Sequence, residues 1–169
     1  MSMASSVFVL DTNIFVEAYK RYYAFDIAPS FWRITKKQAE LARIISIDRV
    51  KHEIDAYGED DQLKNWVNDE FYQWFKPTAV DAVINAYRQV MMWSTSHAQF
   101  TAAAKAEFAN IADSWLVAYA LANHYILVTH EVYDPGIRKR IPIPNACRHF
   151  DVEHIDTFEM LRRLNARIG

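Results

Sequence analysis

The fold is decided by residues 7–13, Val-Phe-Val-Leu-Asp-Thr-Asn. Four consecutive apolar residues, two of them β-branched, are typical of a strand buried on both faces of a parallel sheet. The run ends at Asp11, so an acid stands at the carboxyl end of the predicted strand. Open α/β sheets bind ligands in the crevice beyond that end. Because an unpaired buried carboxylate is costly, we expect Asp11 to be paired, to cap a helix or to hold a cation.

Composition describes one globular domain. The chain has 169 residues, 51% of them hydrophobic, and only 3 glycines and 5 prolines, so we predict a single domain over residues 1–169 without long linkers. A formal net charge of −2 requires any contact with nucleic acid to use a local basic patch. The single Cys147 excludes an internal disulfide and fits a reducing compartment. With no predicted signal peptide or membrane span, we expect a cytoplasmic protein without membrane contact.

Strand-like and helix-like segments alternate along the chain. Besides the first strand, we predict strands at residues 44–47, 75–77, 125–129 and 152–155. Helices are predicted at residues 14–20, 35–45, 49–57, 61–74, 79–93, 101–109, 113–123, 144–150 and 156–164. This order predicts an α/β protein with three layers, in which helices cover both faces of a Rossmann-like, mainly parallel sheet of about five strands.

Four acids are predicted to meet at the carboxyl edge of this sheet. Asp11 and Glu131 each follow a buried strand, and Asp113 lies in the first turn of a helix that should start at the same edge. Glu53 lies about a turn into a helix that Asp48 is expected to cap. Four carboxylates repel one another unless a cation joins them, and Mg²⁺ prefers oxygen ligands. Such a site suits phosphoryl chemistry, in which metal ions activate water.

Each acid also has a simpler interpretation. Asp11 could cap the helix at residues 14–20, and Asp113 could cap the helix that follows Asn110-Ile-Ala. Glu53 and Glu131 could be solvated. Only the joint placement of the four acids favours a shared site.

Four motifs in this order resemble the PIN-domain nucleases over nearly the whole chain. They are Val-Leu-Asp11-Thr12-Asn13, Val50-Lys-His-Glu53-Ile54, Ala112-Asp113-Ser-Trp-Leu-Val-Ala118-Tyr-Ala120 and Leu127-Val128-Thr129-His130-Glu131. The match is closest to a PIN-like subgroup with an aromatic stretch after the first acid, here Tyr22 to Trp32. The resemblance implies a PIN fold and a Mg²⁺- or Mn²⁺-dependent endoribonuclease. Because bacterial relatives are commonly VapC-type toxins, it also implies a cognate antitoxin protein, and we expect a homodimer.

The resemblance assigns roles to the acids and their neighbours. Asp11 and Asp113 would hold one ion, and Glu53 would ligate an ion or orient the attacking water. Glu131, where many members have Asp, would complete the cage or recruit a second ion. The residues expected to hydrogen-bond to the acids and hold them in place are Asn13 and Thr129.

Several residues around the acids have more than one interpretation. RNA phosphates are expected to contact Arg138, Lys139 and Arg140, with a less favoured second patch at Arg33, Lys36 and Lys37. The rings of residues 22–32 could stack on unpaired bases, although packing under a loop or at a subunit contact is the preferred interpretation. We assign neither His52 nor His130 as a metal ligand, and we interpret Cys147 as a small buried residue.

Three functions stay open. The first is a metal-dependent endoribonuclease, the toxin of a toxin–antitoxin pair. The second is another Mg²⁺-dependent phosphate hydrolase that uses Asp11 as its nucleophile, as the haloacid dehalogenase group does; that group needs a second acid where this chain has Asn13. The third is a non-catalytic PIN-like interaction or RNA-binding module.

Overall fold

A parallel sheet forms the centre of the computed structural model, which describes residues 5–56 and 61–169. In these residues the strands are β1 (Phe8–Leu10), β2 (Ile44–Ile47), β3 (Phe75–Lys76), β4 (Ile126–Val128) and β5 (His154–Ile155). Every strand pair is parallel, and the order across the sheet is β3-β2-β1-β4-β5. The predicted five-stranded parallel sheet is therefore confirmed.

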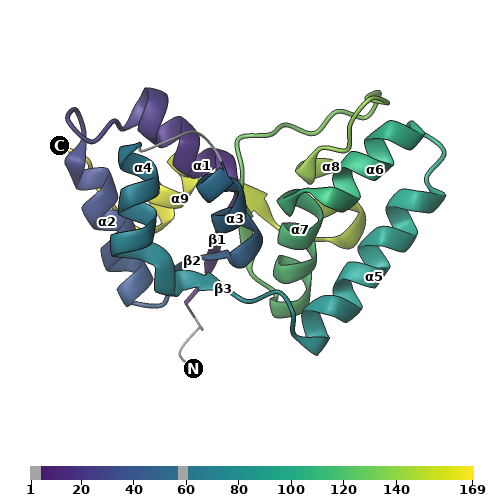
Figure 1. The fold of residues 1–169 in the computed structure, drawn as a ribbon, viewed down its shortest axis with the longest axis horizontal. Helices are drawn as coiled ribbons and strands as arrows, with labels where there is room; N and C mark the ends of the chain where they lie inside the picture. The colour runs from purple at the N-terminus through teal and green to yellow at the C-terminus, as the bar shows by residue number, and fades with distance from the viewer. Residues whose placement is uncertain (1–4, 57–60) are drawn as a thin grey trace.

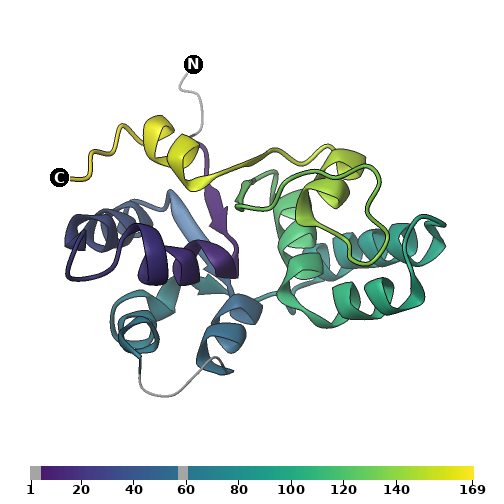
Figure 2. The ribbon, with the colours of Figure 1, turned by 90° about the horizontal axis from the view of Figure 1, so that it is seen from above.

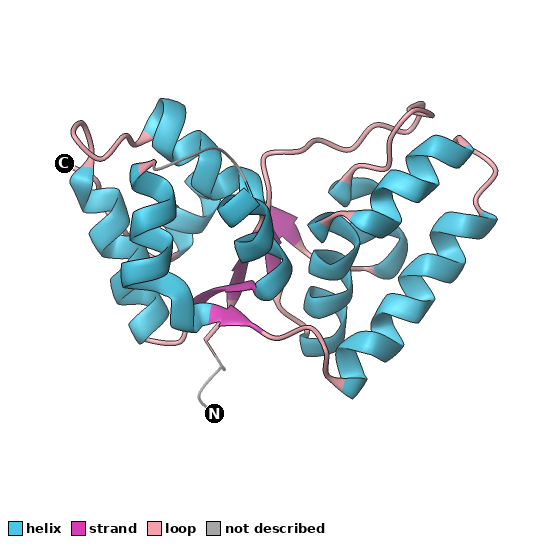
Figure 3. Cartoon of the chain, in the orientation of Figure 1, coloured by secondary structure: helices cyan, strands magenta, loops and turns pink. Residues whose placement is uncertain are grey.

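Helices lie on both sides of the sheet, as Figures 1, 2 and 3 show. One group comprises α1 (Thr12–Glu17), the π-helical η1 (Ala18–Tyr22), α2 (Pro29–Glu40), α3 (Asp48–Ala56), α4 (Gln62–Trp66), the π-helical η2 (Val67–Phe71) and the 3₁₀ turn η3 (Tyr72–Trp74). The other comprises α5 (Asp81–Ser96), α6 (Ala102–Asn110), α7 (Ala112–Asn123) and α8 (Ile143–Phe150), and α9 (Thr157–Arg163) follows β5. Within this arrangement α3 contacts both α1 and α7.

The strand order explains where a site can form. The chain enters the sheet at its middle strand, β1, and moves outward through β2 and β3. It then returns to the other side of β1 with β4 and moves outward again to β5. The direction of winding therefore reverses between β1 and β4, the place where α/β sheets leave a crevice beyond the strand ends.

Burial of apolar side chains on both faces holds these layers together. All three residues of β1 and all three of β4 are buried, which matches the continuous apolar runs in the sequence. Six residues of α7 are buried, among them Leu116 and Val117, because this helix packs against β4 and four neighbouring helices. The predicted core role of Cys147 also fits, since its side chain is fully buried in α8.

The prediction placed the start of α2 incorrectly. The helix begins at Pro29, not at Thr35, because proline fits the first helical position, where its missing N–H is not needed. Thr35 lies inside the helix, and its hydroxyl donates to the Phe31 carbonyl over 2.8 Å. The helix also ends at Glu40, not Ile45, because Ala42 takes a left-handed conformation with φ 61° before β2.

Two other segments differ from the prediction in length or lie partly outside the described residues. The helix predicted over residues 61–74 is divided into α4, η2 and η3. Asp61 caps α4 by accepting a 2.7 Å hydrogen bond from the Lys64 backbone N–H. The expected end of α3 at Gly58 and the acidic residues Glu59 and Asp60 lie outside the described residues.

Candidate functional site

Asp11 and Thr129 lie side by side at the point where the winding reverses. Leu10 pairs with Val128 in the sheet, so the residues that follow them leave β1 and β4 together. The Thr129 hydroxyl donates a 3.0 Å hydrogen bond to Asp11 Oδ2, and both side chains are buried. Asp11 occupies the N-cap position of α1 but makes no side-chain capping bond. Its carboxylate is therefore held across the sheet rather than used as a helix cap.

Contacts at the start of α3 fix the helix that carries Glu53. Asp48 accepts hydrogen bonds from both the backbone N–H (3.1 Å) and the hydroxyl (2.8 Å) of Thr78, just after β3. One residue on, the Arg49 guanidinium lies 4.2 Å from the ring centroid of Trp115 in α7, a cation–π contact. The first contacts hold α3 to the segment after β3, and the second holds it against α7, which Glu53 also contacts.

Glu53 connects the beginnings of two other helices. Its Oε2 accepts a 2.6 Å hydrogen bond from the Thr12 hydroxyl at the start of α1. Its Oε1 accepts a 2.8 Å hydrogen bond from the Ala112 backbone N–H at the start of α7. The negative charge suits the positive end of the α7 dipole. Glu53 is thus ordered by two donors rather than solvated.

The predicted capping of α7 by its own sequence is wrong. The N-cap residue is Ile111, whose side chain has no acceptor, and Asp113 makes no capping bond. Glu53, from a helix more than fifty residues earlier, satisfies the Ala112 N–H instead. Asp113 in the first turn of α7 is therefore left without the capping role that would have been its simplest explanation.

Glu131 lies just beyond β4 and pairs with the guanidinium of Arg140. Only 11% of the Glu131 side chain is exposed, while 52% of the Arg140 side chain is. Arg140 also lines a narrow crevice with Asp113, next to the buried Phe108 and Ile141. A basic side chain that the sequence suggested for RNA contacts thus lies against two of the acids.

Asp11 and Asp113 lie close enough to the other carboxylates for the charges of those groups to raise their pKa. Burial raises the pKa of Asp11 from 3.8 to about 7, and the charges of Glu131 and Glu53 add to this increase, while the Thr129 hydroxyl lowers it. Burial also raises the pKa of Asp113 well above its usual value, with further increases from Asp11, Glu131 and Glu53. Negative charge at this edge of the sheet therefore exceeds what the surrounding groups compensate.

Arg140 reduces this imbalance only in part. Burial raises the pKa of Glu131, although the adjacent Arg140 guanidinium lowers it. The same guanidinium lowers the pKa of Asp113 less than burial and the three carboxylates raise it. A region of buried, mutually repelling carboxylates is a suitable place for a divalent cation.

The side chains are not arranged as a ready metal cage. Among residues 5–56 and 61–169, no three His, Cys, Asp or Glu side chains are positioned to hold one metal ion. Glu53 is turned to Thr12 and Ala112, and Glu131 is turned to Arg140. The donor set fits Mg²⁺ or Mn²⁺ chemically, since all four groups are carboxylates.

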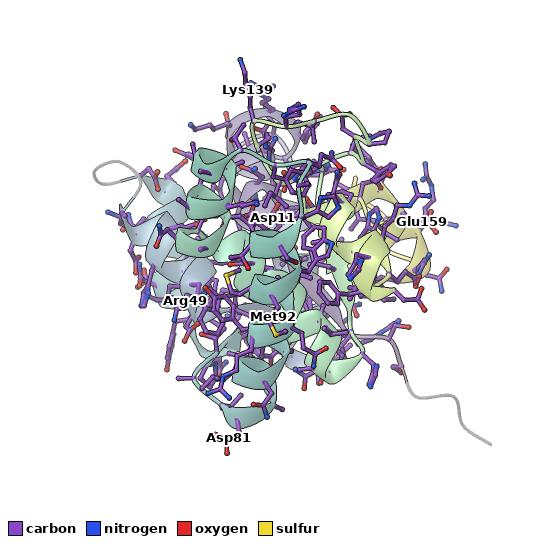
Figure 4. The ribbon with its side chains drawn as sticks, turned by 90° about the vertical axis from the view of Figure 1, so that its right-hand side faces the viewer. Asp11, Arg49, Asp81, Met92, Lys139 and Glu159 are labelled. Carbon is purple, nitrogen blue, oxygen red and sulfur yellow. The ribbon has the colours of Figure 1, made fainter. Side chains whose placement is uncertain are left out.

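The remaining predicted site residues lie around these acids. Asn13 is exposed and lines a cavity of about 630 Å³ with Thr12, Glu53 and the end of α1. No hydrogen bond between Asn13 and an acid is found in the described part of the chain, so its supporting role stays a prediction. Arg138 and Lys139 are exposed, and Figure 4 shows Lys139 at the periphery, pointing away from the molecule.

The sequence did not predict the contacts of two residues around the acids. Thr12 was recognised only as part of a motif, yet its hydroxyl fixes Glu53. Arg140 was assigned to RNA, yet it pairs with Glu131. Glu131 and Arg140 are nine residues apart in a loop, and no helical or strand periodicity relates two positions in a loop. Their pairing therefore could not be predicted from the sequence.

The fold of the chain is similar to that of a solved structure. The crystal structure of FitAcB from Neisseria gonorrhoeae aligns with 88% of this chain and 96% of that one, with a TM-score of 0.55 and 15% sequence identity. At this identity the likeness concerns the fold alone, and it supports a PIN-like α/β architecture. No helix in the described residues is long and apolar enough to cross a membrane.

Sequence comparison assigns the family. No curated protein matches the chain. Residues 8–168 match the family described as a domain of unknown function (DUF4411), and the chain belongs to that family.

Proposed function

We propose that this protein is a metal-dependent endoribonuclease whose site consists of Asp11, Glu53, Asp113 and Glu131. The observation that carries the proposal is that the charges of Glu53 and Glu131 raise the pKa of the buried Asp11 and Asp113 at the reversal between β1 and β4. A structural ion-pair network would balance such charges, whereas here burial raises the pKa of Asp11, Asp113 and Glu131. For Asp11 and Asp113, repulsion by neighbouring carboxylates raises the pKa further. Uncompensated acids at the ligand-binding edge of an α/β sheet favour a cation-dependent reaction.

Each acid of the proposed site has a role that is consistent with its contacts. Asp11 and Asp113, with Glu131, would hold Mg²⁺ or Mn²⁺, and a bound ion would supply charge stabilisation to the phosphate and a more acidic water. Thr129 keeps the Asp11 carboxylate oriented. Glu53, fixed by Thr12 and the α7 N-terminus, would accept a hydrogen bond from the attacking water and orient it.

RNA is the proposed substrate, and the cations of the loop after β4 would contact its phosphates. Arg138 and Lys139 are exposed for this purpose. If Glu131 held a metal ion, Arg140 would lose this partner and could contact an RNA phosphate in its place. An antitoxin partner and a homodimer belong to the same proposal, and the resemblance to VapC-type toxins supports them.

Cleavage of RNA tests the proposal. Purified protein is incubated with single-stranded RNA in Mg²⁺, in Mn²⁺ and in EDTA, alongside Asp11→Asn and Asp113→Asn. We expect cleavage by the wild type in either metal, none in EDTA, and a loss of about 10²-fold or more in both variants, as for groups that stabilise charge in the transition state. The matched control is Asp61→Asn, which changes an acid that caps α4 away from the site. Equal cleavage by all four proteins would refute the proposal.

A further inference from the structure

The aromatic residues of the segment 22–32 do not behave alike. Tyr23 stacks on Phe31 with ring centroids 4.4 Å apart, and Phe25 stacks on Trp32 at 4.2 Å. The Trp32 indole N–H donates to the Tyr23 carbonyl over 2.7 Å. These four rings pack against one another within the chain, as the structural interpretation of this segment expects. Tyr22 is the exception, since 49% of its surface is exposed.

Tyr22, whose ring also lies 6.4 Å from that of Tyr23, belongs to a group of three rings from distant parts of the chain. Its ring lies 5.8 Å from that of His130, after β4, and 5.8 Å from that of Phe158, in α9. His130 and Phe158 are 6.2 Å apart, which closes the triangle. His130 Nε2 lies 3.1 Å from the hydroxyl of Thr157, a hydrogen bond that fixes the imidazole. We call Tyr22, His130 and Phe158 the aromatic step.

The aromatic step is continuous with the acid site. His130 stands in the chain between Thr129, which binds Asp11, and Glu131. Phe158 lies in the first turn of α9, directly after β5, the strand that pairs with β4. The step therefore extends the same carboxyl edge of the sheet outward from the acids. Tyr22 and Phe158 are 49% and 39% exposed, so part of each residue is accessible to a ligand.

We propose that the aromatic step binds an unpaired base of the RNA by stacking, beside the nucleotide whose phosphate lies at the acids. This inference rests on the proposed function, and it assigns single-stranded RNA as the substrate class. Rings offer a base-binding surface that tolerates every sequence, because each base has a π face. In a duplex both faces of a base are covered by its neighbours, so the step selects against paired RNA.

Charge and size favour a base over another occupant. The chain carries a net charge of −2 and buried acids at this edge, so phosphate attraction alone gives weak binding there. Stacking of a neutral base supplies affinity that these charges cannot. The surface of three rings is far smaller than the roughly 1,200–2,000 Å² that a stable protein interface buries. A second copy or a partner protein would need contacts well beyond the aromatic step.

Binding in the absence of cleavage tests the inference. All variants carry Asp11→Asn and are measured in EDTA by fluorescence anisotropy, with a labelled RNA that has no self-pairing and with its duplex. Stacking on one base is worth enough that Tyr22→Ala should weaken single-strand binding about 5- to 100-fold. Tyr22→Phe keeps the ring and should bind within about twofold of the parent protein. Phe158→Ala provides a second, independent loss of binding.

The control is Tyr72→Ala, which removes a tyrosine that is 60% exposed on η3, away from the step. It should leave the affinity unchanged, and duplex binding should be weak for every variant. Equal affinity of Tyr22→Ala, Phe158→Ala and the parent for single strands would overturn the inference. So would a change of oligomeric state in Tyr22→Ala with unchanged RNA binding, since the step would then be a protein contact.

The two proposals can fail separately. If the wild type never cleaves RNA but its binding of single strands still depends on Tyr22, the proposed nuclease activity is refuted and the aromatic step remains an RNA-binding site. If cleavage depends on metal but Tyr22→Ala does not change RNA binding, the proposed nuclease activity stands and the proposed role of the aromatic step is refuted.

Discussion

Replacing Asp11 by asparagine should stabilise the metal-free protein at high pH. An acid whose pKa is raised by folding keeps its proton in the folded state at a pH where the unfolded chain has released it. For Asp11, burial and the charges of Glu131 and Glu53 move the pKa from 3.8 to about 7. Between about pH 4 and pH 7 the folded state binds more protons, so stability falls as the pH rises through this window and is level above it.

The size of the effect follows from the shift. A move from 3.8 to about 7 corresponds to about 4 kcal/mol of stability lost by pH 8. The asparagine that replaces Asp11 carries no charge, and its amide oxygen can still accept the hydrogen bond from Thr129. Asp11→Asn should therefore match the wild type near pH 4 and be more stable by about 2–4 kcal/mol at pH 8. Loss of the Asp11 charge also removes its repulsion of the Asp113 carboxylate, which further stabilises the folded protein.

Urea unfolding followed by tryptophan fluorescence measures this difference. Both proteins are compared in EDTA at several values between pH 4 and pH 8. Asp61→Asn serves as the control, because it replaces a partly exposed capping acid with an equally good cap. A variant that is less stable than the wild type at pH 8, or a difference that does not change with pH, would refute the reasoning.

Four further outcomes are expected. Thr12→Val removes one of the two hydrogen bonds that fix Glu53 and should lower cleavage about tenfold with little change in melting temperature, measured by initial rates and circular dichroism. Arg140→Gln removes the cation beside Glu131 and should tighten Mn²⁺ binding several-fold by calorimetry; weaker binding would show that the ion pair orders the site. Leu116→Ala, in the fully buried face of α7, should cost about 2–5 kcal/mol in urea unfolding. Millimolar Mg²⁺ or Mn²⁺ should raise the melting temperature of the wild type, and no shift would count against a shared site.

The sheet could be predicted because its signal is local. The apolar runs at β1, β2 and β4 need only burial on both faces to be recognised as strands, and the structure contains all three. The boundaries of the helices were harder to predict from the sequence. The start of α2 at Pro29 was missed because aromatic residues around the proline were interpreted as a loop, although they pack against one another within and before the helix.

The sequence predicts four acids at one edge of the sheet, but it does not predict the contacts that these acids make. Strand ends and helix starts meet at one edge of a parallel sheet, so Asp11 and Asp113 could be placed together from topology alone. The bonds of Glu53 to Thr12 and to Ala112 join residues 41 and 59 positions apart, and no sequence period connects them. The same holds for the meeting of Tyr22 with Phe158, which depends on how η1 and α9 pack.

Titration of the protein with Mn²⁺ by isothermal calorimetry at pH 8 tests the central claim most directly. If the four carboxylates form a cation site, the wild type binds Mn²⁺ with a defined stoichiometry, and the Asp11→Asn, Asp113→Asn double variant does not. Binding of equal affinity and stoichiometry by both proteins, or no binding by a folded wild type, would contradict the account.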